Sequence, residues 1–188
     1  GRAGAPGALL AGHSMGGAIA LEVALDPPPC LRGLALLGTG GRLRVTQSIL
    51  GFMKGLRPGA DLVPFVRAGF AAGAAEDRVR ALAERVAGSM VAMGHADFVA
   101  CDAFDRLSDL ERVGVPTLVL CGGEDPLTPV KYSKHLASAI PGATLALIDG
   151  VGHMLEVEAP DEVADALDAF RRRLGEPDQI LKKTPVVH

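Results

Sequence analysis

The most informative part of this chain is the segment Gly7-Ala-Leu-Leu-Ala-Gly-His-Ser-Met-Gly-Gly17, in which a short apolar run leads into Gly-His-Ser-Met-Gly. The pattern predicts a buried strand that ends in a sharp turn and opens a helix. Ser14 occupies the apex of that turn, and we expect glycine at Gly12 and Gly16 because side chains there would collide. A serine held in this way projects its hydroxyl clear of the sheet, where a base and a substrate can reach it from opposite sides.

Further apolar runs indicate that the first strand belongs to a parallel sheet. The runs that we interpret as strands are short and continuous, as expected when helices cover both faces of a sheet, and they span 8–11, 31–37, 116–121 and 143–148. Helical patterns lie between or after them, at 16–25, 129–140 and 161–174. Strands that alternate with helices predict the α/β class, with a mostly parallel sheet and flanking helices.

One long segment interrupts this alternation. No strand is evident over 42–115, where alanine, leucine, valine and charged residues recur at helical spacing, notably over 76–93. We therefore predict the following organisation: a core formed by 1–41 and 116–175, a helical insertion over 42–115, and a frayed tail over 176–188.

Composition excludes several classes of function. The chain is 48% hydrophobic and 22% charged with a net charge of −3, which is typical of a globular protein. It has no long basic stretch that would indicate nucleic-acid binding, and no apolar run reaches the roughly 18 residues of a membrane span. The three cysteines lie far apart, so we interpret them as free thiols of a reducing, cytoplasmic compartment. The histidine spacing offers no typical catalytic zinc site, and we expect no metal and no cofactor.

Two later loops carry the residue types that a nucleophilic serine needs. A serine hydroxyl is activated when an imidazole takes its proton, and a carboxylate fixes the tautomer of that imidazole. Asp125 and His153 each follow a predicted strand, and the carboxyl ends of parallel strands meet at one edge of the sheet. Three alternatives remain open: Asp125 only shapes its turn, Asp102 or Asp105 is the acid, or His153 is a structural loop histidine.

Three segments together resemble the α/β-hydrolase family. They read Gly-His-Ser-Met-Gly-Gly, then Pro-Thr-Leu-Val-Leu-Cys-Gly-Gly-Glu-Asp-Pro-Leu-Thr-Pro, then Gly-Val-Gly-His-Met-Leu-Glu-Val-Glu-Ala-Pro. The resemblance covers residues 7–174, and it identifies the sharp turn at Ser14 as a nucleophile elbow. It implies that Ser14 is the nucleophile, that His153 is the general base and then the general acid, and that Asp125 orients this histidine.

The same resemblance implies further parts of the site. The backbone N–H of Met15 would donate one hydrogen bond to the oxyanion, the insertion would form a helical cap over the active site, and His13 would pack without a chemical role. It also implies a larger sheet, of which this chain would carry the last four strands only, and a second oxyanion donor from a loop before the elbow. We therefore expect the strand at 8–11 to present an unpaired apolar edge.

The leading functional hypothesis is that the protein hydrolyses a carboxylic ester or lactone of a small, largely apolar substrate through an acyl-serine intermediate. The same triad would also serve carbon–carbon bond hydrolysis, acyl transfer or cofactor-free perhydrolysis, and a non-catalytic or truncated module is an alternative of another class. The sequence leaves open whether the large apolar residues of the insertion pack within the cap or line an acyl pocket. These residues are Phe52, Met53, Leu56, Val63, Phe65, Phe70, Met90, Met93 and Phe98.

Overall fold

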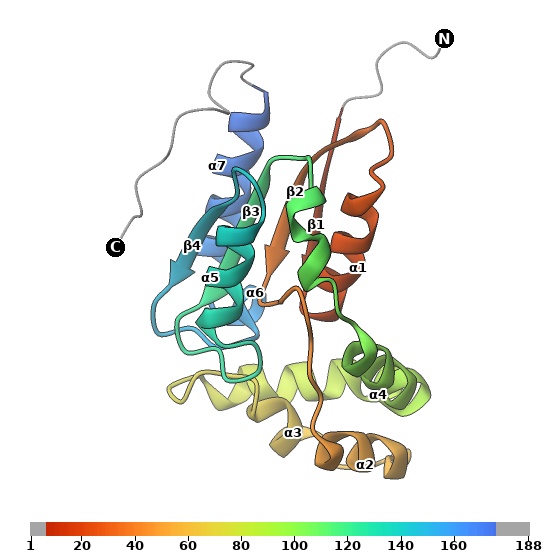
Figure 1. Cartoon of the computed structure of the whole chain (residues 1–188). Coiled ribbons are helices and arrows are strands. Elements are labelled where there is room, and N and C mark those ends of the chain that lie inside the picture. The colour runs from red at the N-terminus through yellow and green to blue at the C-terminus, as the bar shows by residue number, and fades with distance from the viewer. Residues whose placement is uncertain (1–6, 176–188) are drawn as a thin grey trace.

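The computed structural model describes residues 7–175, and these form a parallel sheet with helices packed around it (Figure 1). The strands are β1 (Ala8–His13), β2 (Leu31–Leu37), β3 (Thr117–Gly122) and β4 (Thr144–Ile148), in the order β1-β2-β3-β4. Each neighbouring pair is parallel. The predicted α/β class and its strands are confirmed, whereas the predicted tail over 176–188 lies outside the described residues.

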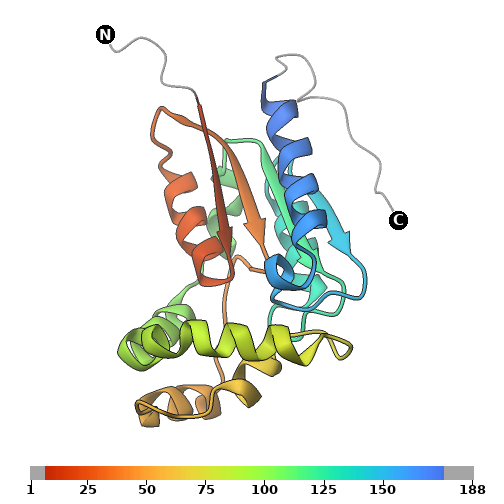
Figure 2. The same ribbon diagram turned by 180° about the vertical axis from the view of Figure 1, so that it is seen from behind.

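Helices cover both faces of the sheet, which explains why its central strands are continuously apolar. One face carries α1 (Met15–Leu25), α5 (Val130–Ala139) and the 3-10 helix η1 (Leu107–Arg112), and the other carries α6 (Leu155–Glu158) and α7 (Pro160–Leu174). Successive residues of β2 enter opposite layers, because Leu34 and Leu36 pack under the first group while Ala35 and Leu37 pack under the second. Figure 2 shows α7 lying across the second face.

Three more helices lie beyond the carboxyl ends of the strands (Figure 1). They are α2 (Gln47–Gly55), α3 (Val63–Arg67) and α4 (Glu76–Ala103), and we call residues 47–103 the cap. The two connections to the cap run side by side: the N–H of Leu43 donates to the carbonyl of Phe104 at 3.3 Å, and that of Arg106 to the carbonyl of Gly41 at 2.7 Å. η1 falls inside the range predicted as insertion, yet it packs on the sheet.

The cap has a hydrophobic cluster of its own. All the large apolar residues named above belong to it except Phe52 and Met93, which are 40% and 56% exposed. Packing within the cap therefore accounts for most of these side chains. Met154 and Val157, which follow β4 in the chain, also join this cluster, so the cap rests on the segment that contains His153.

β1 is an edge strand. Among the described residues it pairs with β2 alone, and its side chains are half-buried or exposed, whereas β3 is buried along its whole length. Ile19 and Val23 on the neighbouring helix α1 are also exposed. The expected apolar edge at 8–11 is confirmed.

Candidate active site

Ser14 stands alone between a strand and a helix, because β1 ends at His13 and α1 begins at Met15. Its φ of 52° and ψ of −117° are unfavourable for a residue with a side chain. Two hydrogen bonds hold this conformation: the N–H of Ser14 donates to Leu37 O at 2.9 Å, and Thr39 Oγ1 donates to Ser14 O at 2.8 Å. The structure therefore contains the sharp strand-to-helix turn that the sequence predicts.

The steric requirement for glycine in this turn differs from our expectation. A Cβ at Gly12 would lie 2.1 Å from the carbonyl oxygen of Gly16, so a side chain is excluded there as expected. The expectation for Gly16 is wrong, because a Cβ at that position meets nothing within 4 Å. Gly17 is the constrained residue instead, since its Cβ would lie 2.6 Å from Thr39 Cγ2. A Cβ at position 17 would point toward Thr39 in the loop after β2, whereas a Cβ at position 16 would point into open space.

The backbone N–H of Met15 is the first of helix α1. The first N–H groups of a helix have no acceptor within the helix, and the helix dipole makes this end attractive to negative charge. The amides of Gly17 and Ala18 are already used, because both donate to Ser14 O, at 2.9 and 3.2 Å. Met15 is therefore positioned to offer an N–H beside the Ser14 side chain.

The loops after β3 and β4 bring Asp125 and His153 into direct contact. His153 Nδ1 lies 2.9 Å from Asp125 Oδ2, and the two residues are 3% and 5% exposed. Burial alone would raise the pKa of Asp125, but hydrogen bonds from His153 and Thr128 outweigh it and hold the pKa below its usual value. An ionised carboxylate can only accept, so His153 Nδ1 carries the proton and Nε2 is left with a free lone pair.

Asp125 also shapes its own turn. Its Oδ1 accepts the N–H groups of Leu127 and Thr128 at 2.9 and 2.8 Å, and its Oδ2 accepts the Thr128 hydroxyl at 2.7 Å. Thr128 Oγ1 lies 3.2 Å from His153 Nδ1 as well. The hydrogen bonds that shape the turn also hold the Asp125 carboxylate in the position where it faces the His153 ring. Asp125 therefore has both roles, and the first supports the second.

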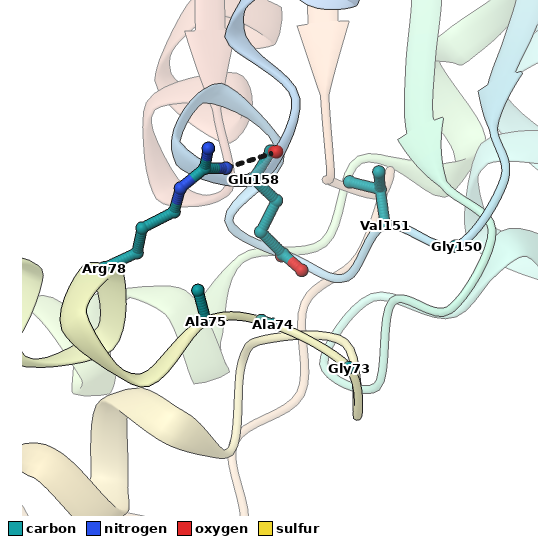
Figure 3. Close-up of a pocket in the computed structure, with 7 residues that line it drawn as sticks. All are labelled: Gly73, Ala74, Ala75, Arg78, Gly150, Val151 and Glu158. Atoms are coloured by element: carbon teal, nitrogen blue, oxygen red, sulfur yellow. Dashed lines mark hydrogen bonds between the residues drawn. The ribbon is translucent and has the colours of Figure 1, made fainter.

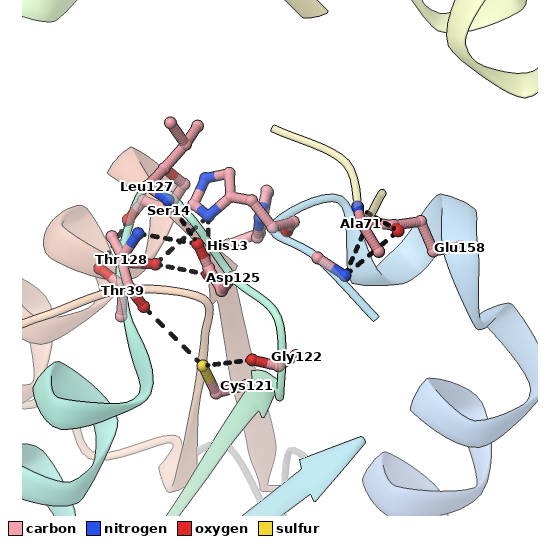
Figure 4. A network of polar contacts seen from close by, with 12 residues as sticks. His13, Ser14, Thr39, Ala71, Cys121, Gly122, Asp125, Leu127, Thr128 and Glu158 are labelled. Atoms are coloured by element: carbon pink, nitrogen blue, oxygen red, sulfur yellow. Dashed lines mark hydrogen bonds and ion pairs between the residues drawn. The ribbon is translucent and has the colours of Figure 1, made fainter. Parts of the chain in front are cut away.

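Ser14 lies at the same end of the sheet as this pair (Figure 4). Its neighbour His13 contacts His153, with ring centroids 4.7 Å apart and His13 Nε2 2.8 Å from His153 O. Within residues 7–175, no hydrogen bond joins Ser14 Oγ to His153. Bonds between a nucleophile and its base are often long until the substrate binds.

His13 is held neutral in this position. Burial, and then repulsion from the charge that His153 carries when it is protonated, lower the pKa of His13 from 6.5 to about 4. Because the carbonyl of His153 can only accept, His13 Nε2 carries the proton and donates it to that oxygen. His13 therefore holds the backbone of the loop that contains His153, which is more than the packing role that the resemblance implies.

The alternative acids lie elsewhere. Asp102 Oδ1 accepts the N–H of Val45 at 3.0 Å, and Asp105 pairs with Arg42 at 3.6 Å. Both therefore hold together the two connections to the cap, and His153 has Asp125 as its carboxylate partner.

Sequence reasoning missed two residues of this region, Thr128 and Glu158. A signal for Thr128 was present, because Asp followed three residues later by Thr is a pattern in which the two side chains bond within one turn. Glu158 accepts backbone N–H groups from Gly152 and Ala71. No local pattern could have found the contact to Ala71, which lies 87 residues earlier in the chain.

No group of three or more His, Cys, Asp or Glu side chains in the described part of the chain is arranged to hold a metal ion. Among residues 7–175, no helix combines the length and the apolar character needed to cross a membrane.

The chain is similar to several proteins that are named as hydrolases or esterases. A thermophilic esterase of known structure superposes with a TM-score of 0.78 at 35% sequence identity, covering 90% of this chain and 67% of the esterase. RutD of Pseudomonas savastanoi pv. phaseolicola, which carries the name carbamate hydrolase, is 30% identical over 168 residues, or 79% of this chain. Rhodomycin D methylesterase DnrP of Streptomyces peucetius is 36% identical over 67 residues, or 36% of this chain and 22% of DnrP.

The chain spans only part of the length of its relatives, whereas the family model matches most of the chain. The chain spans 61% of the length of that RutD. The family model described as "Alpha/beta hydrolase family" matches residues 1–166, which is most of this chain. The strand-to-helix turn at Ser14, the contact between Asp125 and His153 and this match agree, and the chain belongs to the alpha/beta hydrolase family.

Proposed function

We propose that the protein is a serine hydrolase that cleaves a carboxylic ester or lactone of a small, largely apolar substrate. The observation that carries this proposal is the buried hydrogen bond of 2.9 Å between His153 Nδ1 and Asp125 Oδ2, at the sheet edge where Ser14 lies. A histidine oriented in this way has its Nε2 free to take a proton from a serine hydroxyl.

The proposed reaction has two stages. Ser14 Oγ attacks the carbonyl carbon while His153 Nε2 takes the hydroxyl proton, and the Met15 N–H donates a hydrogen bond to the developing oxyanion. The tetrahedral intermediate collapses as His153 protonates the leaving alcohol, which leaves an acyl-serine. Water then attacks the acyl carbon and gives a proton to His153 Nε2; as the bond between the acyl carbon and Ser14 Oγ breaks, His153 returns that proton to Ser14 Oγ and the carboxylic acid is released.

The local electrostatics support the role of Asp125. A lowered pKa keeps its carboxylate ionised, and an ionised carboxylate stabilises the imidazolium that forms in each stage. Removing such a carboxylate in a measured serine hydrolase lowers kcat by roughly 10⁴-fold, because the imidazole takes the wrong tautomer.

The relatives support an acyl-transfer reaction with a carbonyl substrate. The esterase and DnrP both act on esters by their names, and RutD on a carbamate, which also contains a carbonyl carbon bonded to oxygen. We infer a small-molecule ester as the substrate class on this basis.

The three cysteines support a reducing compartment. Cys30, Cys101 and Cys121 are all free thiols, and burial raises the pKa of Cys101 and of Cys121. We retain the cytoplasm as the proposed location.

The test uses the full-length protein with Ser14→Ala and, as a matched control, Ser138→Ala. Ser138 is an exposed serine of α5 whose hydroxyl donates to His135 O, so its loss leaves the sheet edge intact. We expect a fluorophosphonate probe to label the wild type and Ser138→Ala but not Ser14→Ala. Hydrolysis of a short-chain p-nitrophenyl ester should fall by roughly 10⁴-fold or more in Ser14→Ala. Equal labelling of Ser14→Ala and the wild type would overturn the proposal.

A further inference from the structure

The backbone of His153 is held by the cap and not only by the core. The N–H of His153 donates to Gly69 O at 2.7 Å. Gly69 belongs to the cap turn, which we define as residues 69–71, and His153 belongs to the histidine loop, residues 150–154. The position of the proposed base therefore depends on where the cap turn lies.

A single carboxylate joins these two segments. Glu158, the last residue of α6, accepts the N–H of Ala71 in the cap turn at 2.9 Å and the N–H of Gly152 in the histidine loop at 3.1 Å (Figure 4). Both Ala71 and Gly152 are buried. Hydrogen bonds to an ionised acceptor are roughly twice as strong as neutral ones, and a buried N–H without an acceptor is costly.

The two segments touch so closely that they cannot move independently. A Cβ at Gly152 would lie 2.3 Å from Ala71 N and 2.6 Å from Phe70 C, so neither a side chain nor water fits between them. Glycine at 152 is what permits this backbone-to-backbone contact. A shift of the cap turn would consequently push directly on the residue that precedes His153.

Arg78 of α4 braces the same junction from the cap. Its Nη1 donates to the carbonyl of Glu158 at 2.8 Å (Figure 3). The same atom donates to the carbonyl of Val157 at 3.2 Å. Arg78 and Glu158 also border a cavity of about 380 Å³, to which the cap contributes residues 73–75 and the histidine loop contributes Gly150 and Val151. None of the proposed triad residues lines that cavity.

We propose that Glu158 is a positioning residue that ties the cap turn to the histidine loop and so sets the placement of His153 toward Ser14 and the substrate. This inference rests on the proposed function, in which His153 is the general base. Glu158 acts through the backbone of Gly152 and His153 and does not touch the reacting atoms. A misplacement of about 1 Å at a reacting group can cost roughly 10²-fold in rate, so the loss of this link appears in kcat.

The test compares Glu158→Gln with a variant that removes a charge elsewhere. Both carboxylate oxygens of Glu158 lie 3.1 Å from Gly152 N, and Oε2 also accepts the N–H of Ala71. Gln keeps the size of Glu, but in either orientation its NH₂ group replaces an oxygen that accepts the Gly152 N–H, so two donors face each other and the negative charge is lost. Glu162→Gln is the control, because Glu162 is exposed in the first turn of α7. Thermal unfolding of each variant checks that the protein under assay is folded.

The first measurement is steady-state hydrolysis of a p-nitrophenyl ester. We expect Glu158→Gln to lower kcat by roughly 10- to 10²-fold with KM within about twofold of the wild type, and Glu162→Gln to match the wild type. An unchanged kcat in folded Glu158→Gln, or a loss that appears only as a higher KM, overturns the inference.

The second measurement does not depend on turnover. The proton of His153 Nδ1, bonded to Asp125, gives a low-field proton NMR resonance that is assigned by its loss in His153→Gln. We expect this resonance to shift or broaden in Glu158→Gln and to stay unchanged in Glu162→Gln. If the wild type hydrolyses no ester, the proposed function fails. The comparison of this resonance between the wild type and Glu158→Gln still tests whether Glu158 positions His153. A resonance identical in Glu158→Gln and the wild type overturns that role.

Discussion

Replacing His13 with Gln should remove a large part of the pH dependence of stability. His13 Nε2 donates to His153 O at 2.8 Å, and the amide nitrogen of Gln can reach a similar position and donate the same bond. Gln does not titrate, so the substitution isolates the protonation of the imidazole. The pKa of His13 is lowered from 6.5 to about 4, first by burial and then by the charge of His153.

The sign and the size follow from the two pKa values. Between pH 6.5 and 4 the unfolded chain binds a proton at His13 and the folded protein does not, so stability falls as the pH falls through this window. Above pH 6.5 this contribution is fully present. The difference between 6.5 and about 4, at about 1.4 kcal/mol per pKa unit, gives about 3 kcal/mol. Glu156, whose pKa is raised by burial, acts in the opposite direction and is present in both proteins.

The assay is urea unfolding of the wild type and His13→Gln at pH 7.5 and at pH 4.5. The free energy of unfolding of the wild type should fall between the two pH values by about 2 to 3 kcal/mol more than that of His13→Gln. Carboxylates away from residue 13 cancel in this comparison, whereas Glu156, whose Oε1 lies 3.6 Å from His13 Nδ1, contacts the substituted residue. If both proteins lost the same stability, His13 would not be the neutral brace that its burial and its hydrogen bond indicate.

Two further pairs of variants test the turn at Ser14 and the support of the acid. Gly17→Ala should lower the free energy of unfolding by about 1–3 kcal/mol, because the new Cβ would lie 2.6 Å from Thr39 Cγ2. Gly16→Ala should be neutral or stabilising, because a Cβ at that position meets nothing within 4 Å. Equal melting temperatures of the two variants would contradict the steric argument. Thr128→Val removes the hydroxyl that donates to Asp125 Oδ2 at 2.7 Å, so it should lower the free energy of unfolding by about 1.5–3 kcal/mol and should also lower the proposed ester hydrolysis. Thr144→Val is the control, because Thr144 Oγ1 is buried without a hydrogen-bond partner among the described residues, and its free energy of unfolding in urea should not fall. An equal loss of stability in the two threonine variants would argue against the role of Thr128.

The strands and the elbow were predictable because their signals are local. Each strand is a short apolar run bounded by glycine or proline, and the helix from Glu76 begins where the helical spacing begins, although it continues to Ala103. Asp125 and His153 could be expected to meet because parallel strands deliver their carboxyl ends to one edge, and the structure joins them at 2.9 Å.

Other features depend on segments that are distant in the chain. A side chain is excluded at position 17 and not at position 16, because it would collide with Thr39, which lies in the loop after another strand. The large apolar residues of the cap gave no sign of whether they pack together, since a helical stripe looks the same in either case.

The alternation of strands and helices and the order of serine, aspartate and histidine were therefore readable from the chain itself, because each rests on residues within one turn or one strand. The tertiary structure alone decided which carboxylate faces His153 and how the cap reaches that histidine. A buried N–H or carboxylate takes whichever partner the packed backbone brings within hydrogen-bond distance, and the bond from Ala71 to Glu158 crosses 87 residues of sequence.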